Sequence, residues 1–179
     1  QIVFFHFYKF NKNFELFKFL FDKEYYDKNK FNIISKISNI PFNKNFILSG
    51  MNLAFMGYYS NAELYPHKSL YHWPDGVWVK KHINIEKLPG RDLINQIKLD
   101  KYYKKILVLG NLSKRSKDYL KKKFKVKVYN QKLPFGSIEQ IKKTKIKLTK
   151  NTLTFITLPT PKQEKLAYHL SKKNAHYKI

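Results

Sequence analysis

Short apolar segments alternate with helical patterns along this chain, and this alternation limits the possible folds more than any other feature. Residues 105–110 form an apolar run that ends in Gly110, and a helical pattern follows at residues 114–124. The same order of strand, turn and helix returns at residues 153–158 and 163–173. Strands joined through helices run parallel, with right-handed crossovers. The sequence therefore predicts an α/β, Rossmann-like fold in which a mostly parallel sheet is flanked by helices.

Other segments fit the same plan. Further strands are predicted at residues 45–49, 71–73 and 126–129, and further helices at residues 11–22, 52–61, 91–99 and 137–143. A chain of 179 residues suffices for one such domain, so we expect a single domain over residues 1–179. Residues 176–179 resemble the start of another strand, and both ends look cut. We therefore expect a fragment that lacks the last strand of its sheet.

Charge is distributed unevenly. The net charge is +24, and residues 101–179 carry 22 of the 36 basic residues but only 3 of the 12 acidic ones. One explanation is compositional drift towards lysine on solvated helix faces, as an AT-rich genome produces. The other is an anionic partner such as lipid or nucleotide phosphate. Cysteine is absent, which excludes disulfides and thiolate metal sites, and no apolar run approaches the roughly 18 residues of a membrane span.

Two polar strings stand where apolar strands stop and helical patterns begin. Pro74-Asp75-Gly76 follows residues 70–73, and Pro161-Lys162-Gln163-Glu164 follows residues 153–158. Ligands of open α/β sheets bind at the carboxyl ends of the strands. We therefore expect a carboxylate from one string, and an amide beside a carboxylate from the other, to share a pocket.

Five motifs occur in a fixed order and together resemble a known family. They are Asn52 after an early strand, Pro74-Asp75-Gly76, Lys87 followed by Gly90-Arg91-Asp92-Leu93, Gly110 at a strand exit, and Pro161-Lys162-Gln163-Glu164. From about Phe46 to the last residue, the chain resembles the WecG/TagA/CpsF family of bacterial glycosyltransferases, which are N-acetylmannosaminyltransferase-like. Residues 1–45 match it poorly and residues 46–179 would form the family-like core.

The resemblance implies a function and a setting. It predicts an inverting, metal-independent glycosyltransferase that moves an N-acetylmannosamine-type sugar from a UDP-sugar to a sugar linked to polyprenyl diphosphate, in surface polysaccharide synthesis. The UDP-sugar is a substrate, and no cofactor is expected. The family works at the inner face of the cytoplasmic membrane, so a cytoplasmic, peripheral location on an anionic membrane surface is expected. A homo-oligomer is possible, and no nucleic-acid partner is expected.

Asp75 is the candidate catalytic residue. Glycosyl transfer requires a group that takes a proton from the acceptor hydroxyl, and a carboxylate within hydrogen-bond reach does this. On the residues alone, Asp75 is more simply the cap of the helix that opens at Gly76. With the resemblance, the general base is the favoured role.

The leaving diphosphate needs positive charge or backbone amides in the absence of a metal. Gly110 and Asn111, in a strand–turn–helix unit typical of a nucleotide-binding half, are the candidate source of amides, and a plain turn is the alternative. Lys87 stands where the family usually has arginine, and Arg91 where it usually has a small residue. Lysine lacks the two-pronged donor of arginine, so either residue is a candidate for the diphosphate contact, and solvated loop charges are the alternative.

The resemblance assigns the remaining candidates to substrate binding. Asn52 would hold a sugar, although Gly50-Met51 replaces the usual Thr-Pro before it, and a helix N-cap is its other role. Gln163 would contact the donor, and Lys162 would add charge beside the diphosphate. Glu164 is more simply an acid favoured by the positive end of its helix. Asp92 is expected to cap or brace its helix.

No His-x-x-x-His or Asp-x-Asp string occurs, so no metal site is predicted.

Two alternatives to an active transferase follow from the sequence. Lysine-rich stretches such as Lys121-Lys122-Lys123 raise the possibility of a nucleic-acid-binding module, although no stacking motif or recognition helix accompanies them. The other alternative is an inactive, truncated transferase.

Overall fold

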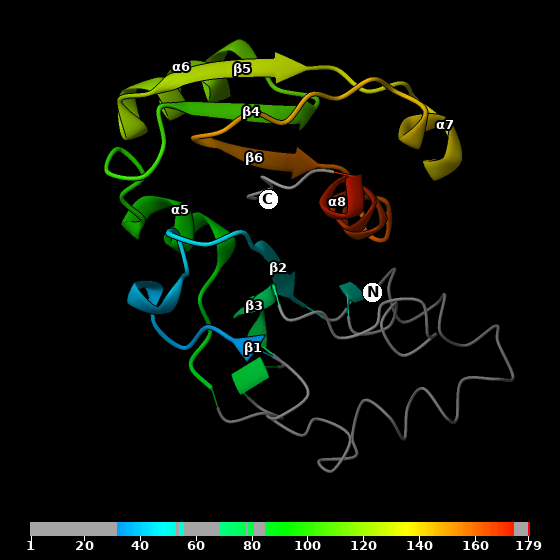
Figure 1. Cartoon of the computed structure of the whole chain (residues 1–179). Coiled ribbons are helices and arrows are strands. Elements are labelled where there is room, and N and C mark those ends of the chain that lie inside the picture. The colour runs from blue at the N-terminus through cyan, green and yellow to red at the C-terminus, as the bar shows by residue number, and fades with distance from the viewer. Residues whose placement is uncertain (1–31, 53, 56–68, 78, 81–84, 174–178) are drawn as a thin grey trace, which may run out of the picture.

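The fold consists of two three-stranded parallel sheets with helices packed on them (Figure 1). This is a computed structural model, and it describes residues 32–52, 54–55, 69–77, 79–80, 85–173 and 179. One sheet has the order β1 (Asn32–Ile33), β3 (Leu70–Pro74) and β2 (Ile47–Met51). The other has the order β5 (Lys127–Gln131), β4 (Lys105–Gly110) and β6 (Thr152–Thr157). The predicted α/β class, with parallel strands flanked by helices, is confirmed.

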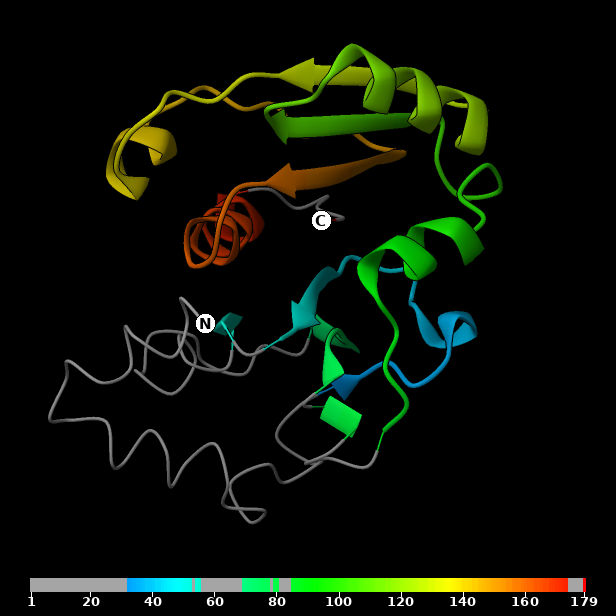
Figure 2. The same ribbon diagram turned by 180° about the vertical axis from the view of Figure 1, so that it is seen from behind.

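Helices connect the strands of both sheets. They are the 3-10 turn η2 (Ile37–Asn39) and the α-helices α5 (Gly90–Gln96), α6 (Lys114–Phe124), α7 (Ile138–Lys142) and α8 (Lys162–Lys173). Figure 2 shows α6 in front of β4 and β5. None of the helices in the described residues has the length and apolar character needed to span a bilayer. The predicted helix at residues 11–22 lies outside the described residues. Of the predicted helix at 52–61, residues 52, 54 and 55 are described, and residues 54–55 are helical.

Local signals account for the helix ends of the β4–β6 half. The Ser113 hydroxyl accepts a hydrogen bond from the Ser116 N–H at 3.1 Å and so caps α6. Lys125 ends α6 in the left-handed conformation, with φ 52°. Ser137 and Gln140 form a reciprocal capping box at the start of α7. These ends agree closely with the predicted boundaries because each depends on neighbouring residues.

Helix α5 is shorter than predicted. It ends at Gln96, and Ile97 takes an extended conformation, whereas the apolar spacing predicted a helix to residue 99. Ile97 and Leu99 are only 6% and 0% exposed. An extended segment sends both side chains into the core, and their burial outweighs the small gain of one more helical turn.

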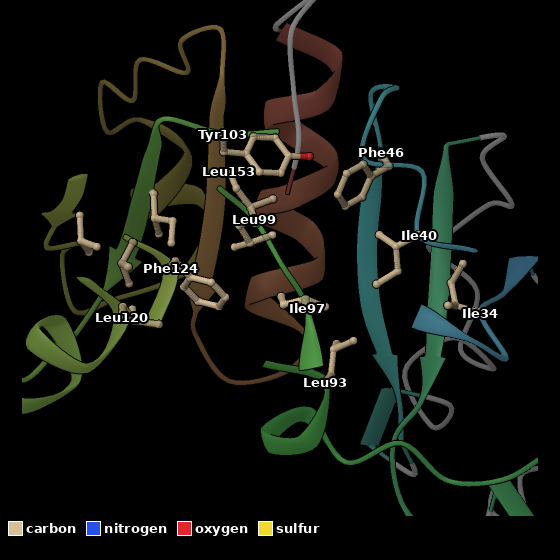
Figure 3. Close-up of a cluster of buried hydrophobic side chains, with 13 residues drawn as sticks. Ile34, Ile40, Phe46, Leu93, Ile97, Leu99, Tyr103, Leu120, Phe124 and Leu153 are labelled. Atoms are coloured by element: carbon tan, nitrogen blue, oxygen red, sulfur yellow. The ribbon is translucent and has the colours of Figure 1, made fainter. Parts of the chain in front are cut away.

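The main core cluster contains side chains from both sheets. In Figure 3, Ile34, Ile40 and Phe46 lie on one side, and Leu120, Phe124 and Leu153 lie on the other, with Leu93 and Ile97 of the α5 region between them. Each fully buried side chain of this size stabilises the fold by about 1.5–3 kcal/mol. Tyr103, 1% exposed, donates its hydroxyl to the Phe42 carbonyl at 3.2 Å. Burial, with some effect of Tyr102, raises the pKa of Tyr103 above its ordinary value, so its hydroxyl stays a donor.

The last residue lies against β2. The Ile179 N–H donates to the Phe46 carbonyl at 3.0 Å, and its own carbonyl accepts from the Leu48 N–H at 2.7 Å. Residues 176–178 of the predicted strand start lie outside the described residues. The described strands form two sheets where one was expected, and Ile179 lies between them (Figures 1 and 2).

Candidate functional site

Asn52 and Asp75 leave two neighbouring strands at the same level. The register of β2 and β3 pairs Met51 with Pro74, so these two residues occupy the next positions. The Asp75 N–H donates to the Met51 carbonyl at 3.2 Å. Asn52 and Asp75 therefore occupy adjacent positions at the carboxyl ends of parallel strands. The predicted pocket shared by Asp75 with Gln163 and Glu164 is a different arrangement, and Asp75 is not among the residues that line the cavity beside Gln163 and Glu164.

Gly50 makes room for the Asp75 carboxylate. A Cβ atom at Gly50 would lie 3.2 Å from Asp75 Oδ2 and 3.0 Å from Trp73 Cζ2. Both are tighter than ordinary contacts, so any larger residue would displace the carboxylate or the indole. The small size of Gly50 therefore sets the position of Asp75.

Asn52 serves as the cap that was its alternative role. Its Oδ1 accepts a hydrogen bond from the Phe55 N–H at 3.0 Å. Its Nδ2 has no hydrogen-bond partner in the described part of the chain. The cap orients the side chain, and the amide nitrogen remains available as a donor to a ligand.

Lys87 and Arg91 lie at the rim of the β3 exit. The Leu88 N–H donates to the Pro74 carbonyl at 2.6 Å, which ties this loop to the residue before Asp75. Lys87 is exposed, and the Arg91 side chain is 87% exposed. Arg91 Nε is 4.0 Å from Asp92 Oδ1, and such exposed pairs contribute little to stability. Asp92 lies in the first turn of α5, whose N-cap is Pro89 without a side-chain hydrogen bond, so Asp92 is not the cap.

Gly110 occupies a turn that excludes any other residue. Its φ is +117°, and a Cβ atom there would lie 2.5 Å from Thr157 Oγ1. Asn130 Nδ2 donates to the carbonyls of Val108 and Gly110 at 3.0 and 2.9 Å. Thr157 Oγ1 donates to the carbonyls of Leu109 and Asn111 at 3.3 Å each. Two side chains thus hold the carbonyls of this turn from neighbouring strands, while Asn111 itself is exposed.

Lys162, Gln163 and Glu164 open α8, and all three form hydrogen bonds within the protein. Lys162 Nζ donates to the Gly136 carbonyl at 2.6 Å. Gln163 Nε2 donates to Thr160 Oγ1 at 3.2 Å and to Glu164 Oε1 at 2.8 Å. The Thr160 hydroxyl also donates to Glu164 Oε1, at 3.0 Å. The Lys162 charge is therefore directed at a carbonyl here, and the Gln163 amide and Glu164 form one small network.

Glu164 combines burial with an unused acceptor. It is 7% exposed, and its Oε2 has no hydrogen-bond partner in the described residues. A buried carboxylate oxygen without a donor is costly. Its place in the first turn of α8 agrees with the predicted role of a first-turn acid. The unpartnered Oε2 could in addition accept a hydrogen bond from an N–H or O–H group of a ligand.

A cavity of 230 Å³ separates the two groups of site residues. Gly50 and Trp73 line it from one sheet, and Gln163 and Glu164 line it from the other side. Trp73 Nε1 is buried and has no hydrogen-bond partner in the described residues. The structure thus brings Asn52, Asp75, Lys87 and Arg91 together at one sheet, and Gly110, Asn111, Lys162, Gln163 and Glu164 at the other.

Sequence reasoning missed several residues that shape this site. Trp73 lies beside Gly50 and Gly90, Thr157 and Asn130 hold the Gly110 turn, and Thr160 orients the Glu164 carboxylate. Thr157 and Asn130 lie at or near strand ends, where a polar residue after apolar ones was the available signal. No local signal marks Trp73, because its role depends on a neighbouring strand.

His72 is a buried base that stays neutral. It is 2% exposed on β3, and its ring centroid is 4.9 Å from that of Phe55. Desolvation lowers the pKa of His72 to about 3. An imidazole with such a pKa carries no charge near neutral pH, so His72 contributes packing rather than charge to the site.

Among the described residues, no group of three or more His, Cys, Asp or Glu side chains could hold a metal ion. Comparisons with models of protein families, with curated proteins and with solved structures gave no match for this chain.

Proposed function

We propose that this chain is an inverting, metal-independent glycosyltransferase that uses a UDP-sugar donor. The observation that carries the proposal is the register of β2 and β3, which makes Asn52 and Asp75 neighbours at the carboxyl ends of parallel strands. The motif order of the sequence supports the donor class, an N-acetylmannosamine-type sugar on UDP. It also supports the acceptor, a sugar linked to polyprenyl diphosphate.

Asp75 acts as the general base in this proposal. Its carboxylate takes the proton of the acceptor hydroxyl as that oxygen attacks the anomeric carbon of the donor. The bond from the anomeric carbon to the diphosphate oxygen breaks in the same step, and UDP leaves with the electron pair. A single displacement of this kind inverts the configuration of the anomeric carbon. The half-buried position of Asp75 allows both contact with a substrate and release of the proton to solvent.

Positive side chains and backbone amides receive the leaving diphosphate. Lys87 and Arg91 are exposed at the rim of the β3 exit and are able to approach a phosphate there. In this proposal the backbone amides of Gly110 and Asn111, in the turn held by Asn130 and Thr157, serve the diphosphate from the other sheet. Gln163 would contact the donor from the first turn of α8. The basic surface of residues 101–179 supports docking on an anionic membrane, where each basic residue contributes about 1 kcal/mol.

The proposal is tested by release of UDP. The assay uses a panel of UDP-N-acetylhexosamines with a lipid-diphosphate-GlcNAc analogue, and it compares the unchanged chain with Asp75→Asn. Loss of a general base is expected to lower acceptor-dependent UDP release by about 10²–10⁴-fold. Asp118→Asn is the matched control, because Asp118 is an exposed acid on α6 away from the site, and it is expected to leave the rate unchanged. Equal rates for Asp75→Asn and Asp118→Asn would overturn the assignment of the base.

The exposed basic face of α6 favours a second candidate, a nucleic-acid-binding module. Lys114, Arg115 and residues 121–123 are exposed on this helix, and Asp118 is its single acid. This candidate predicts binding to RNA or DNA that weakens steeply with salt, with one unit of slope lost for about each phosphate contact removed. Tight, salt-sensitive binding together with no UDP release from folded protein would replace the first proposal. Absence of both, with Asp75 intact, would support an inactive, truncated transferase.

A further inference from the structure

Helix α8 borders a second hollow, on a different face from the cavity between the sheets. The α8 residues that line that cavity are Gln163, Glu164, Ala167 and Tyr168. Those that line the second hollow, here called the α7–α8 groove, are Leu166, His169, Leu170 and Lys173. The two sets have no residue in common, and their spacing places them on different faces of the helix. The groove is therefore separate from the candidate site.

The α7–α8 groove has a volume of 730 Å³ and three walls. They are α7, the segment at residues 143–146 and α8. Helix α7 packs against α8, and Figure 1 shows the two helices at the same end of the β4–β6 half. Part of the lining is apolar, because Leu166 and Leu170 are 0% and 4% exposed and Ile146 is half-buried.

Positive residues gather at this groove and are poorly matched by acids. Besides Glu139, the charged or titratable residues that line it in the described part of the chain are Lys142, Lys143, Lys145, His169 and Lys173. Lys142 Nζ donates to Glu139 Oε1 at 3.1 Å. Lys143, Lys145 and Lys173 form no ion pair with any described residue. Three lysine charges are therefore left without an acidic partner at one concave surface.

His169 responds to this charge. Its ring donates a hydrogen bond to the Lys142 carbonyl. Burial and then the charges of Lys173 and Lys142 lower the pKa of His169, while the hydrogen bond and Glu139 act in the opposite direction. The lysine charges thus disfavour a proton on the ring. A negative ligand in the groove would oppose them and raise the pKa of His169.

The lining favours a small anion over a nucleic acid. Grooves for single-stranded nucleic acid combine positive charge with aromatic side chains on which bases stack. No Phe, Tyr or Trp residue is among the described residues that line the α7–α8 groove. Apolar walls beside charges of one sign focus the electric field of a cleft, which strengthens the attraction of a compact anion. Lysine binds phosphate as a point charge, without a requirement for two-pronged geometry.

We propose that the α7–α8 groove binds a small anion through a phosphate or diphosphate group. Lys145 from the 143–146 segment and Lys173 from α8 contact this group from two walls, and Lys143 adds a third charge. The Thr144 hydroxyl and a protonated His169 are further donors in the lining. The site goes beyond the proposed glycosyltransferase function and does not depend on it.

Calorimetric titration with inorganic diphosphate, at constant ionic strength, tests the site in the whole chain of 179 residues. The test variant, Lys145→Gln with Lys173→Gln, removes one charge from each of two walls. The matched control, Lys98→Gln with Lys101→Gln, removes the same total charge outside the groove. All four lysines are exposed, so both variants are expected to fold. The test variant should bind diphosphate at least about tenfold more weakly, and the control should bind it as the unchanged chain does.

A second measurement locates the anion. The pKa of His169 is followed by NMR of its ring C–H protons, assigned with His169→Gln. Saturation with diphosphate is expected to raise this pKa in the unchanged chain and in the control variant. In the test variant the pKa of His169 should not respond to diphosphate. A merely general effect of charge on the fold would not separate the two variants in this way.

A third measurement identifies the source of the phosphate group. Vesicles of phosphatidylcholine, with and without phosphatidic acid, are the second probe. Binding of free diphosphate that is lost in the test variant supports the site with a soluble ligand. Binding to phosphatidic acid vesicles alone, lost in the same variant, supports the site with a lipid headgroup.

Three results would overturn the proposal. The first is equal loss of affinity in the test and control variants, which would assign binding to the diffuse positive charge of the chain. The second is a pKa of His169 that does not change at saturating diphosphate in the unchanged chain. The third is the absence of saturable binding to either probe. None of these readouts uses UDP or a sugar acceptor, so they are independent of the outcome of the glycosyltransferase assay.

Discussion

The two sheets hold their site residues in different ways. In the β4–β6 half, the Gly110 turn is held by side-chain hydrogen bonds from Asn130 and Thr157, and the following helix is capped by Ser113. In the β2–β3 half, the placement of Asp75 depends on strand register and on the empty space at Gly50. The β4–β6 half therefore presents a turn that neutral side chains hold in place. The β2–β3 half presents a charged carboxylate whose position depends on packing.

In the proposed glycosyltransferase, the two halves would have different roles: one would bind the diphosphate and the other would take up the proton. A rigid backbone turn that leads into the start of a helix suits a diphosphate, which needs amide donors in fixed positions. A carboxylate that acts as a base needs partial exposure, so that a substrate reaches it and its proton exchanges with solvent. Substitutions at corresponding positions in the two halves therefore test the comparison.

The largest effect on stability is expected for Gly110→Ala. Alanine at φ +117° is strained, and its Cβ would lie 2.5 Å from Thr157 Oγ1, so the free energy of unfolding should fall by about 2–4 kcal/mol. Chemical denaturation measures this change. The double variant Gly110→Ala, Thr157→Ala removes the clash but keeps the backbone strain. Its loss of unfolding free energy should therefore be about 1 kcal/mol smaller than the sum of the losses in the two single variants. A loss below 0.5 kcal/mol in the single variant would contradict the rigid-turn interpretation.

Gly50→Ala is the counterpart in the other half and should cost less stability. The contacts of 3.0 and 3.2 Å are tight but involve the side chains of Trp73 and Asp75, which are able to shift, so a loss of about 1–2 kcal/mol is expected. Because the displaced group is the proposed base, UDP release should fall more than stability does. Thermal unfolding and the release assay together measure both effects. Full activity in a destabilised Gly50→Ala variant would show that the position of Asp75 is not critical.

The free energy of unfolding is expected to depend on pH because of His72 in the β2–β3 half. The pKa of His72 in the fold, about 3, lies below the ordinary histidine value of 6.5, so the unfolded chain binds the proton more tightly. The stabilising effect of the neutral form is complete above pH 6.5 and is lost as the pH falls towards 3, with a slope of at most about 1.4 kcal/mol per pH unit. Denaturation between pH 7 and pH 4 should show this slope in the unchanged chain and lack it in His72→Gln. An identical slope in His72→Gln would assign it to other groups.

The smallest effect on stability is expected for Lys87→Ala and Arg91→Ala. Both residues are exposed, so the free energy of unfolding should change by less than about 0.5 kcal/mol in each variant. The variant that loses the diphosphate contact should bind UDP about 10–150-fold more weakly, because a charge-assisted hydrogen bond contributes about 1.5–3 kcal/mol. Calorimetric titration with UDP measures this. Unchanged UDP binding in both variants would remove the β3 rim from the proposed diphosphate site.

The sequence predicted the elements of the β4–β6 half better than those of the rest. β4 and α6 have their predicted bounds, because glycine, serine and a left-handed lysine mark their ends locally. Helix α5 ends earlier than predicted, because burial of Ile97 and Leu99 in a distant core decided its last turn. The hydrogen bond from Lys162 to the Gly136 carbonyl could not be predicted from the sequence either, because the two residues lie 26 positions apart.

Local patterns in the sequence are enough to predict which residues follow the strands, because apolar runs, glycines and helix caps act through near neighbours. They thereby placed Asn52, Asp75, Gly110 and Gln163 at positions where ligands of α/β proteins bind. Three features required the folded structure: which strand ends adjoin, that Gly50 accommodates the Asp75 carboxylate, and that Glu164 is buried with an oxygen that has no partner in the described residues. Those features depend on register and packing between segments far apart in the chain, and no local pattern encodes the distance between two strands.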